Sequence, residues 1–338
     1  MIVTVTPNPS LDRTLELDRL VRGAVNRASG GRLDPGGKGV NVSRALAAHG
    51  VKTTAVVPLG GADGVRLAAL LADLGIDVRA VPIAGGTRTN VTVAEPEGTT
   101  TKLNEPGPHL MAAEVAALRA AVLDAAAPGA WVVCCGSLPR GVDPGLLADL
   151  VAPLRARGAR VVLDTSGPAL HAVLRGGGAR PDLIKPNHEE LAEAVGRPLP
   201  TLGDVVEAAQ ELRALGVGAV LASLGPDGAV LVDAAGAVHA DARVARPRST
   251  VGAGDALLAG FLSVATRRTA PAGPGTTGPA VLDDAVTARE ALVAALAWGA
   301  AATCLPGSRM PGPDDVAAVA VTVHDRCDLQ RPLGGASE

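Results

Sequence analysis

The sequence predicts an α/β fold, with a mostly parallel sheet covered by helices and a small β-sheet lid. From Val51 onward, short runs rich in β-branched residues alternate with helical patterns, as in parallel strands joined by helices. Residues 12–35 and 87–104 break this alternation. The second segment has a period of two around a Pro-Glu-Gly turn, which is typical of a hairpin. We expect these two segments to form the lid.

The composition favours a globular protein that acts on small molecules. The chain has 338 residues, of which 47% are hydrophobic, enough to build the core of one large domain or two modest ones. Aromatic residues make up 1% of the chain, so the core must consist of Ala, Val and Leu, and stacking on nucleic-acid bases is not expected. A net charge of −3 without a basic stripe also argues against a nucleic-acid surface.

The cysteines and the N-terminus indicate a reducing, cytoplasmic compartment. The 4 cysteines have no CxxC spacing, which argues against a zinc site. Residues 1–6 have neither the basic segment nor the long apolar core of a secretory signal. Glycine and proline interrupt the uncharged run over 291–308, so we expect a buried Ala-rich helix there and no membrane segment.

The first strand is expected over residues 2–6, and Asp12 follows it. The carboxyl ends of strands face the ligand crevice in an open α/β sheet, so a carboxylate there is well placed to hold sugar hydroxyls. The alternative for Asp12 is a turn residue of a loop.

A Gly-rich turn then feeds a helix that ends near Gly50. This turn is not a phosphate-binding P-loop, because Arg32 and Gly39 stand where that motif needs Gly and Ser or Thr. Lys38 would lie at the helix N-terminus, where it can bind a phosphate or a sugar oxygen as a point charge. Gly37 gives the turn its freedom and Asn41 adds hydrogen bonding. A purely structural tight turn is the alternative.

The next elements are a strand to Leu59, a helix to Leu74, a strand over 78–83 and the lid hairpin. Arg88 lies on this hairpin, where it can clamp an anion with two hydrogen bonds or remain a solvated edge-strand charge. A helix over 111–127 and a strand over 130–135 lead to the polar loop 136–141. This loop also lies at a strand end and so points to the crevice.

The alternation continues through a helix over 145–157, a strand over 160–164 and a helix after Pro168. Leu183 and Ile184 end another strand, which places Lys185, Asn187 and Glu190 together. A lysine suits a nucleotide phosphate, and Glu190 is suited to hold Mg²⁺ through water.

The C-terminal half is expected to add a helix over 204–215, a strand over 219–224 and two hairpin strands that end at 244. Residues 269–281, rich in Pro and Gly, are predicted to form a flexible surface insertion. A long helix is predicted over 285–302 and a last helix over 314–323.

A second Gly-rich turn, Gly252-Ala253-Gly254-Asp255, opens another predicted helix. Free N–H groups and the helix dipole favour a negative charge at such a start, and small residues let an anion approach the backbone. A carboxylate repels a phosphate, so Asp255 is better explained as a base that takes a proton from an attacking hydroxyl. An anion hole beside a base is the logic of phosphoryl transfer to an alcohol. The alternative is an Asp cap on a Gly-rich turn.

The ordered set of motifs T-P-N-P-S-L-D, G-G-K-G-V-N-V-S-R-A-L, T-R-T-N, G-S-L-P-R-G-V, K-P-N-H-E-E-L and S-T-V-G-A-G-D-A resembles the PfkB, or ribokinase-like, carbohydrate kinases. The resemblance covers essentially the whole chain. It implies one kinase domain over 1–338, a three-layer α/β/α fold with a β lid, and a homodimer formed through that lid. It also implies ATP and Mg²⁺ as cofactors.

Matching residue by residue carries the family's roles onto this chain. Asp255 resembles the catalytic base, with Gly252, Ala253 and Gly254 as its anion hole. Positions that match phosphosugar contacts are Asp12, Gly37, Lys38, Asn41, Arg88, Asn90, Ser137 and Arg140. Nucleotide-side positions are Lys185, Asn187, Ser223, Gly225 and Gly228, and Glu190 matches the acid of the N-x-x-E motif linked to the metal.

The expected reaction is transfer of the γ-phosphoryl group of ATP to the 6-hydroxyl of D-fructose 1-phosphate. Lys38 and Arg88 are expected to anchor together the phosphate already on the sugar. A ketohexofuranose carries hydroxymethyl groups at both ends, so tagatose 6-phosphate and fructose 6-phosphate are alternative substrates. A catalytically inactive sugar-phosphate sensor on the same scaffold is the alternative from another class. A dinucleotide-dependent oxidoreductase is disfavoured, because no G-x-G-x-x-G follows the first strand.

Overall fold

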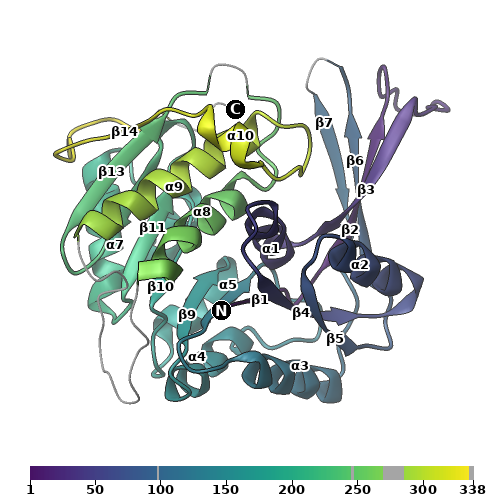
Figure 1. Cartoon of the computed structure of the whole chain (residues 1–338), viewed down its shortest axis with the longest axis horizontal. Coiled ribbons are helices and arrows are strands. Elements are labelled where there is room, and N and C mark those ends of the chain that lie inside the picture. Colours follow the sequence, from purple (N-terminus) through teal and green to yellow (C-terminus); the bar gives the residue numbers. More distant parts are fainter. Residues whose placement is uncertain (97–98, 245–246, 269–284, 335–338) are drawn as a thin grey trace.

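The computed structural model describes the chain except for residues 97–98, 245–246, 269–284 and 335–338 (Figure 1). Within the described part, the larger sheet has ten strands in the order β14-β13-β12-β11-β10-β9-β8-β1-β4-β5. Its parallel strands are β1 (Ile2–Val5), β4 (Thr53–Leu59), β5 (Asp77–Pro82), β8 (Trp131–Cys135), β9 (Arg160–Asp164), β10 (Leu183–Ile184) and β11 (Ala219–Ser223). Its antiparallel strands are β12 (Ala229–Val232), β13 (Ala237–Ala242) and β14 (Val321–Val323).

Helices cover both faces of this sheet, because successive side chains of its central strands alternate between two apolar cores. Ile2 and Trp131 pack into the core of one face, with α1 (Lys38–Ala48), α8 (Ala253–Arg268) and α9 (Ala285–Thr303). Val3 and Val132 pack into the core of the other. That face carries α3 (Ala112–Ala125), α4 (Leu146–Ala156), α5 (Gly167–Arg175), α6 (His188–Val195) and α7 (Leu202–Ala214). The predicted three-layer α/β/α fold is confirmed.

A separate four-stranded sheet stands beside the larger one, as predicted for the lid (Figure 1). In the order β3-β2-β6-β7, it comprises β3 (Gly30–Gly36), β2 (Ser10–Glu16), β6 (Arg88–Ala94) and β7 (Thr100–Asn104). Helix α2 (Gly61–Asp73) packs against β2, β3, β4 and β5, between the two sheets. Because β2 begins at Ser10, Asp12 lies on a lid strand, beside Asp34 and Asn90, rather than on a crevice loop of the larger sheet.

The predicted last helix over 314–323 is present only in its first half. Helix α10 covers Pro313–Ala317, and Val321–Val323 forms β14, which pairs with β13 at the edge of the larger sheet. The Val-Thr-Val run is β-branched and meets an unpaired strand edge there, so strand pairing replaces helix. The predicted insertion over 269–281 lies outside the described residues.

The long apolar run that raised a membrane question forms the C-terminal part of α9 and the loop after it. Among the described residues, no helix combines the length and apolar character needed to cross a membrane.

Candidate active site

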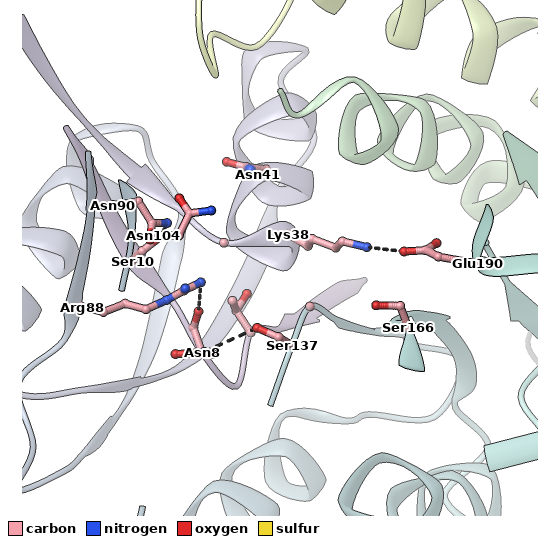
Figure 2. Close-up of a pocket in the computed structure, with 13 residues that line it drawn as sticks. Asn8, Ser10, Lys38, Asn41, Arg88, Asn90, Asn104, Ser137, Ser166 and Glu190 are labelled. Carbon is pink, nitrogen blue, oxygen red and sulfur yellow. Dashed lines mark hydrogen bonds and ion pairs between the residues drawn. The ribbon is translucent and has the colours of Figure 1, made fainter. Parts of the chain in front are cut away.

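A cavity of about 370 Å³ lies between the lid, the start of α1 and the carboxyl ends of the parallel strands (Figure 2). The predicted site residues that line it are Gly37, Lys38, Asn41, Arg88, Asn90, Ser137 and Glu190. The other polar residues of the lining were not predicted from the sequence; they are Thr6, Asn8, Ser10, Asn104 and Ser166. Asn8 and Ser166 follow β1 and β9, so the strand-end signal that identified Ser137 could have found them too.

Two glycines let α1 begin against the wall of this cavity. Gly37 has a φ of 107°, and a Cβ there would lie 2.7 Å from Thr6 Cγ2 and 3.3 Å from Pro9 Cα. A side chain at Gly37 is therefore excluded by conformation and by contact. A Cβ on Gly36 would overlap the carboxylate of Asp12. The positive end of the α1 dipole consequently lies beside the cavity.

The start of α8 brings Asp255 against Asn41 of the cavity lining, although Asp255 itself does not line the cavity. Gly252, with a φ of 78°, turns the chain into the helix, and Asp255 is 7% exposed in its first turn. Asn41 Nδ2 donates a hydrogen bond of 2.9 Å to Asp255 Oδ2. Burial, and then the negative charge of Asp164, raise the pKa of Asp255 to about 6, against the opposing effects of Asn41 and two lysines. A buried carboxyl group with such a pKa can accept a proton near neutral pH.

Asp164, at the end of β9, is a buried member of the site that the sequence analysis missed. Lys38 Nζ donates a 2.8 Å hydrogen bond to Asp164 Oδ1, and Lys185 Nζ lies 3.3 Å from Oδ2. Burial alone would raise the pKa of Asp164, but Lys185 and Lys38 outweigh burial and hold the pKa below its ordinary value. The signal was available, because a carboxylate directly ends a strand of buried residues.

Lys38, expected to anchor the phosphate of the sugar together with Arg88, contacts two carboxylates in the structure. Figure 2 shows its side chain directed toward Glu190, away from Arg88 on the lid. Its Nζ lies 3.6 Å from Glu190 Oε1, in addition to the contact with Asp164. The carboxylates of Asp164 and Glu190 raise the pKa of Lys38, although burial opposes them, so the ammonium group stays charged.

The lid side of the cavity is a hydrogen-bonded set of polar groups. Ser10 Oγ donates to Asp12 Oδ1 at 2.8 Å and Asn90 Nδ2 donates to the same oxygen at 3.0 Å. Burial raises the pKa of Asp12 despite these bonds. Arg88 donates to the backbone oxygens of Asn8 at 3.1 Å and Glu105 at 2.8 Å, which ties the lid to the end of β1.

A second cavity, of about 420 Å³, adjoins the first across Arg88. Arg140 also lines it, together with His109 and Glu105, so two guanidinium groups and one carboxylate face this cavity. Arg140 therefore lies on the far side of Arg88 from Lys38 and Asn41, and its NH2 donates to Gly107 O at 3.3 Å.

The residues predicted for the nucleotide side surround the start of α6. Asn187 caps this helix: its Oδ1 accepts from Glu190 N at 2.7 Å, and Glu190 Oε2 accepts from Asn187 N at 2.9 Å. This reciprocal capping box fixes the Glu190 side chain at the edge of the cavity. Lys185 lies close to α8, since a Cβ on Gly254 would be 3.4 Å from its Nζ.

The loop after β11 holds the remaining predicted residues, outside the lining of both cavities. It contains η1 (Gly225–Asp227). Ser223, the last residue of β11, pairs with Asn187. Gly228 follows η1 and packs against Ala240. Gly225 and Gly228 have φ values of 58° and 89°. Asp227 accepts hydrogen bonds from Arg331 NH2 at 3.2 Å and Gly334 N at 3.0 Å, so the C-terminal segment holds this loop in place.

Comparison with known families gives a match over most of the chain. The model for pfkB family carbohydrate kinases matches residues 6–311. The chain belongs to the pfkB family. The predicted base, anion-hole turn, lysines and lid residues all fall within the matched segment.

The chain is also similar to individual members of this family. A 1-phosphofructokinase of Rhodobacter capsulatus is 42% identical over 95% of this chain and 96% of its own length. The ATP-dependent 6-phosphofructokinase isozyme 2 of Escherichia coli is 38% identical over 76% of this chain and 83% of its own length. Phosphofructokinase-2 from Escherichia coli, solved with potassium, superimposes with a TM-score of 0.83 at 33% identity, covering 94% of this chain and 96% of that one.

The protein is accordingly a carbohydrate kinase, and pfkB kinases use ATP with Mg²⁺. The residues present suit these groups. The ammonium groups of Lys38 and Lys185 both contact Asp164, and that of Lys185 lies beside Gly254 at the start of α8, which suits a polyphosphate. Glu190 presents a carboxylate at the cavity, and Mg²⁺ prefers one or two carboxylates together with retained waters.

Proposed function

We propose that the protein transfers the γ-phosphoryl group of ATP to the 6-hydroxyl of D-fructose 1-phosphate and so forms fructose 1,6-bisphosphate. The observation that carries the proposal is the buried Asp255, which lies at a Gly-rich helix start and is hydrogen-bonded to a residue of the cavity lining. The named substrate is supported by the 1-phosphofructokinases among the relatives.

In this proposal Asp255 accepts the proton of the attacking 6-hydroxyl as the new P–O bond forms. Gly252, Ala253 and Gly254 give the transferring group close access to backbone N–H donors at the positive end of α8. Asp12, Asn41 and Asn90 orient the sugar hydroxyls. Lys38 lies between Asp164 and Glu190, where it neutralises charge near the point of transfer.

The proposed cofactor contacts lie on the opposite side of the cavity from the lid. Lys185, Asn187, Ser223, Gly225 and Gly228 would hold ATP, and Glu190 would hold Mg²⁺ through water. When bound, Mg²⁺ neutralises charge on the phosphates of ATP.

For the phosphate already on the sugar, we propose Arg88, Arg140, Gly37 and Ser137. Arg88 lines both cavities and Arg140 lines the second, so a phosphate can lie beside the sugar cavity with guanidinium groups around it. This arrangement recognises the phosphorylated end of the sugar but does not distinguish one ketohexose phosphate from another. Fructose 6-phosphate is the main alternative, because one relative is a 6-phosphofructokinase, and tagatose 6-phosphate is another.

The test is the initial rate of ADP formation with Mg·ATP and each of the three sugar phosphates, compared as kcat/KM. We expect fructose 1-phosphate to lead by at least tenfold. If fructose 6-phosphate or tagatose 6-phosphate has the highest kcat/KM, the kinase activity stands and the proposed substrate is wrong. If none of the three sugar phosphates leads to ADP formation, the catalytically inactive sugar-phosphate sensor is favoured.

We further propose that the protein works in the cytoplasm as a homodimer joined through the lid. Support comes from the two strand edges of the lid, at β3 and β7, and from Leu103 of β7, which is 60% exposed. One relative, phosphofructokinase-2 from Escherichia coli, has been solved in a tetrameric inhibited form. Light scattering with and without ATP distinguishes a dimer from a monomer or a tetramer.

A further inference from the structure

Arg44 is a buried arginine of α1 that the reaction proposed above leaves without a part. It is 8% exposed, and its NH1 donates a 3.0 Å hydrogen bond to Asn41 Oδ1. Asn41 in turn donates through Nδ2 to Asp255 Oδ2 at 2.9 Å. Arg44 is thus joined to the carboxyl group of Asp255 through one amide.

The chemistry of these groups allows one orientation of that amide. An arginine side chain has donors and no acceptor, so Arg44 can bond to the oxygen of Asn41 but not to its nitrogen. An ionised carboxylate accepts and does not donate, so Asp255 can bond to the nitrogen of Asn41 but not to its oxygen. Reversing the amide would break both bonds and place two oxygens against each other.

On its other side, Arg44 reaches the lid. Its NH2 lies 3.5 Å from Asp34 Oδ1 on β3, and Asp34 Oδ2 accepts a 2.8 Å bond from Arg32 Nε. Arg32 NH2 donates to Pro306 O at 2.9 Å, in the loop after α9. The cationic group of Arg44 is therefore held from the lid while it holds Asn41.

We propose that Arg44 is a positioning residue for phosphoryl transfer: it fixes the Asn41 amide so that Asp255 receives a hydrogen bond and keeps one orientation toward the sugar hydroxyl. The inference rests on the proposed function, since it takes Asp255 as the base. Arg44 itself touches neither substrate in this scheme.

A purely structural role, in which Arg44 only ties α1 to the lid, makes a different prediction. The charged groups around Asp255 are Lys38, Lys185, Asp164 and Arg44. Losing Arg44 removes one positive charge and releases the amide that stabilises the ionised carboxylate, so both effects raise the pKa of Asp255. A loss of the lid tie alone would leave that pKa unchanged.

The experiment measures kcat and both KM values from pH 5 to 9 for the full-length enzyme and Arg44→Met. We expect kcat at pH 7 to fall by roughly ten- to a hundredfold, the KM for ATP to stay within about twofold, and the acid limb of kcat to move up by about one pH unit. Arg44→Lys retains a cation and a donor, so its acid limb should lie close to the wild-type position. If Arg44→Met does not fold, Arg44→Gln is measured and judged in the same way.

Asp34→Asn is the matched control, because it weakens the tie to the lid and leaves the bond between Arg44 and Asn41. An unmoved acid limb in Arg44→Met, or an equal movement in Asp34→Asn, would overturn the inference. Asp255→Asn separates the two proposals: retained turnover there rejects the base, and the inference with it. An inactive Asp255→Asn with an unmoved Arg44→Met profile rejects the role of Arg44 alone.

Discussion

The end of β9 and the start of α8 each place one buried carboxyl group in the site, yet the two groups behave oppositely. Asp164 is 0% exposed and Asp255 is 7% exposed, so burial acts against ionisation in both. Asp164 contacts the ammonium groups of Lys38 and Lys185, and its pKa is lowered. Asp255 receives one hydrogen bond from an amide, and its pKa is raised to about 6. Direct partners, rather than burial, decide which group is a fixed charge and which can exchange a proton.

The largest expected effect follows from removing the proton acceptor. Asp255→Asn keeps the shape of the side chain and abolishes its basicity, so kcat should fall by about a thousandfold or more. Binding of the sugar phosphate, measured by calorimetry, should stay within a few fold of wild type, because the amide still fills the site. A kcat within tenfold of wild type would assign the proton transfer to another group.

Asp164→Asn should produce a smaller loss with the opposite effect on the pH profile. Asp164 is a negative charge that raises the pKa of Asp255, so its removal should move the acid limb of kcat to a lower pH than in the wild type. We expect kcat to fall roughly ten- to a hundredfold, because Lys185 and Lys38 both lose their contact with Asp164 and Lys38 keeps only Glu190. A shift of the limb to higher pH would contradict this account. The titration of ATP is common to both enzymes and cancels in the comparison.

The same variant tests the fixed charge through stability. The pKa of Asp164 is lower in the folded chain than its ordinary value of 3.8. Its stabilising contribution is therefore fully present above that ordinary value and is lost as the pH falls through the folded value. The difference in thermal stability between wild type and Asp164→Asn should be large at pH 7 and shrink below about pH 4. A difference that does not depend on pH would indicate a packing effect.

The smallest effect is expected from replacing Lys38, which contacts both Asp164 and Glu190. Lys38→Met should lower kcat about tenfold and change the KM for fructose 1-phosphate less than Arg88→Met does, because Lys38 points toward Asp164 and Glu190 and away from the lid. Steady-state kinetics on both variants make the comparison. If the KM for fructose 1-phosphate rises more in Lys38→Met than in Arg88→Met, Lys38 binds the phosphate of the sugar after all.

The sequence predicted the parts of this site that depend on local chemistry. Glycine-rich turns at Gly37 and Gly252 mark helix starts, and the β lid interrupts a regular alternation of strands and helices. It did not predict which side chains meet. Asp164 was predicted only as the end of a strand, because its two lysines come from distant segments. Lys38 was expected to bind the sugar phosphate with Arg88, and its contacts with Asp164 and Glu190 were not predicted. The helix predicted over 314–323 extends too far for the same reason, since β14 depends on a free strand edge supplied by β13.

The contact between Gly36 and Asp12 ties two positions that lie on different strands of the lid. Any Cβ at position 36 would occupy the space of the Asp12 carboxylate. Residues at positions 12 and 36 should therefore vary together among related sequences: a relative that has the acid at position 12 must also have the glycine at position 36. A relative with a smaller residue in place of the acid is free to accept alanine at position 36, so the pair indicates whether that relative retains the sugar contact proposed for Asp12.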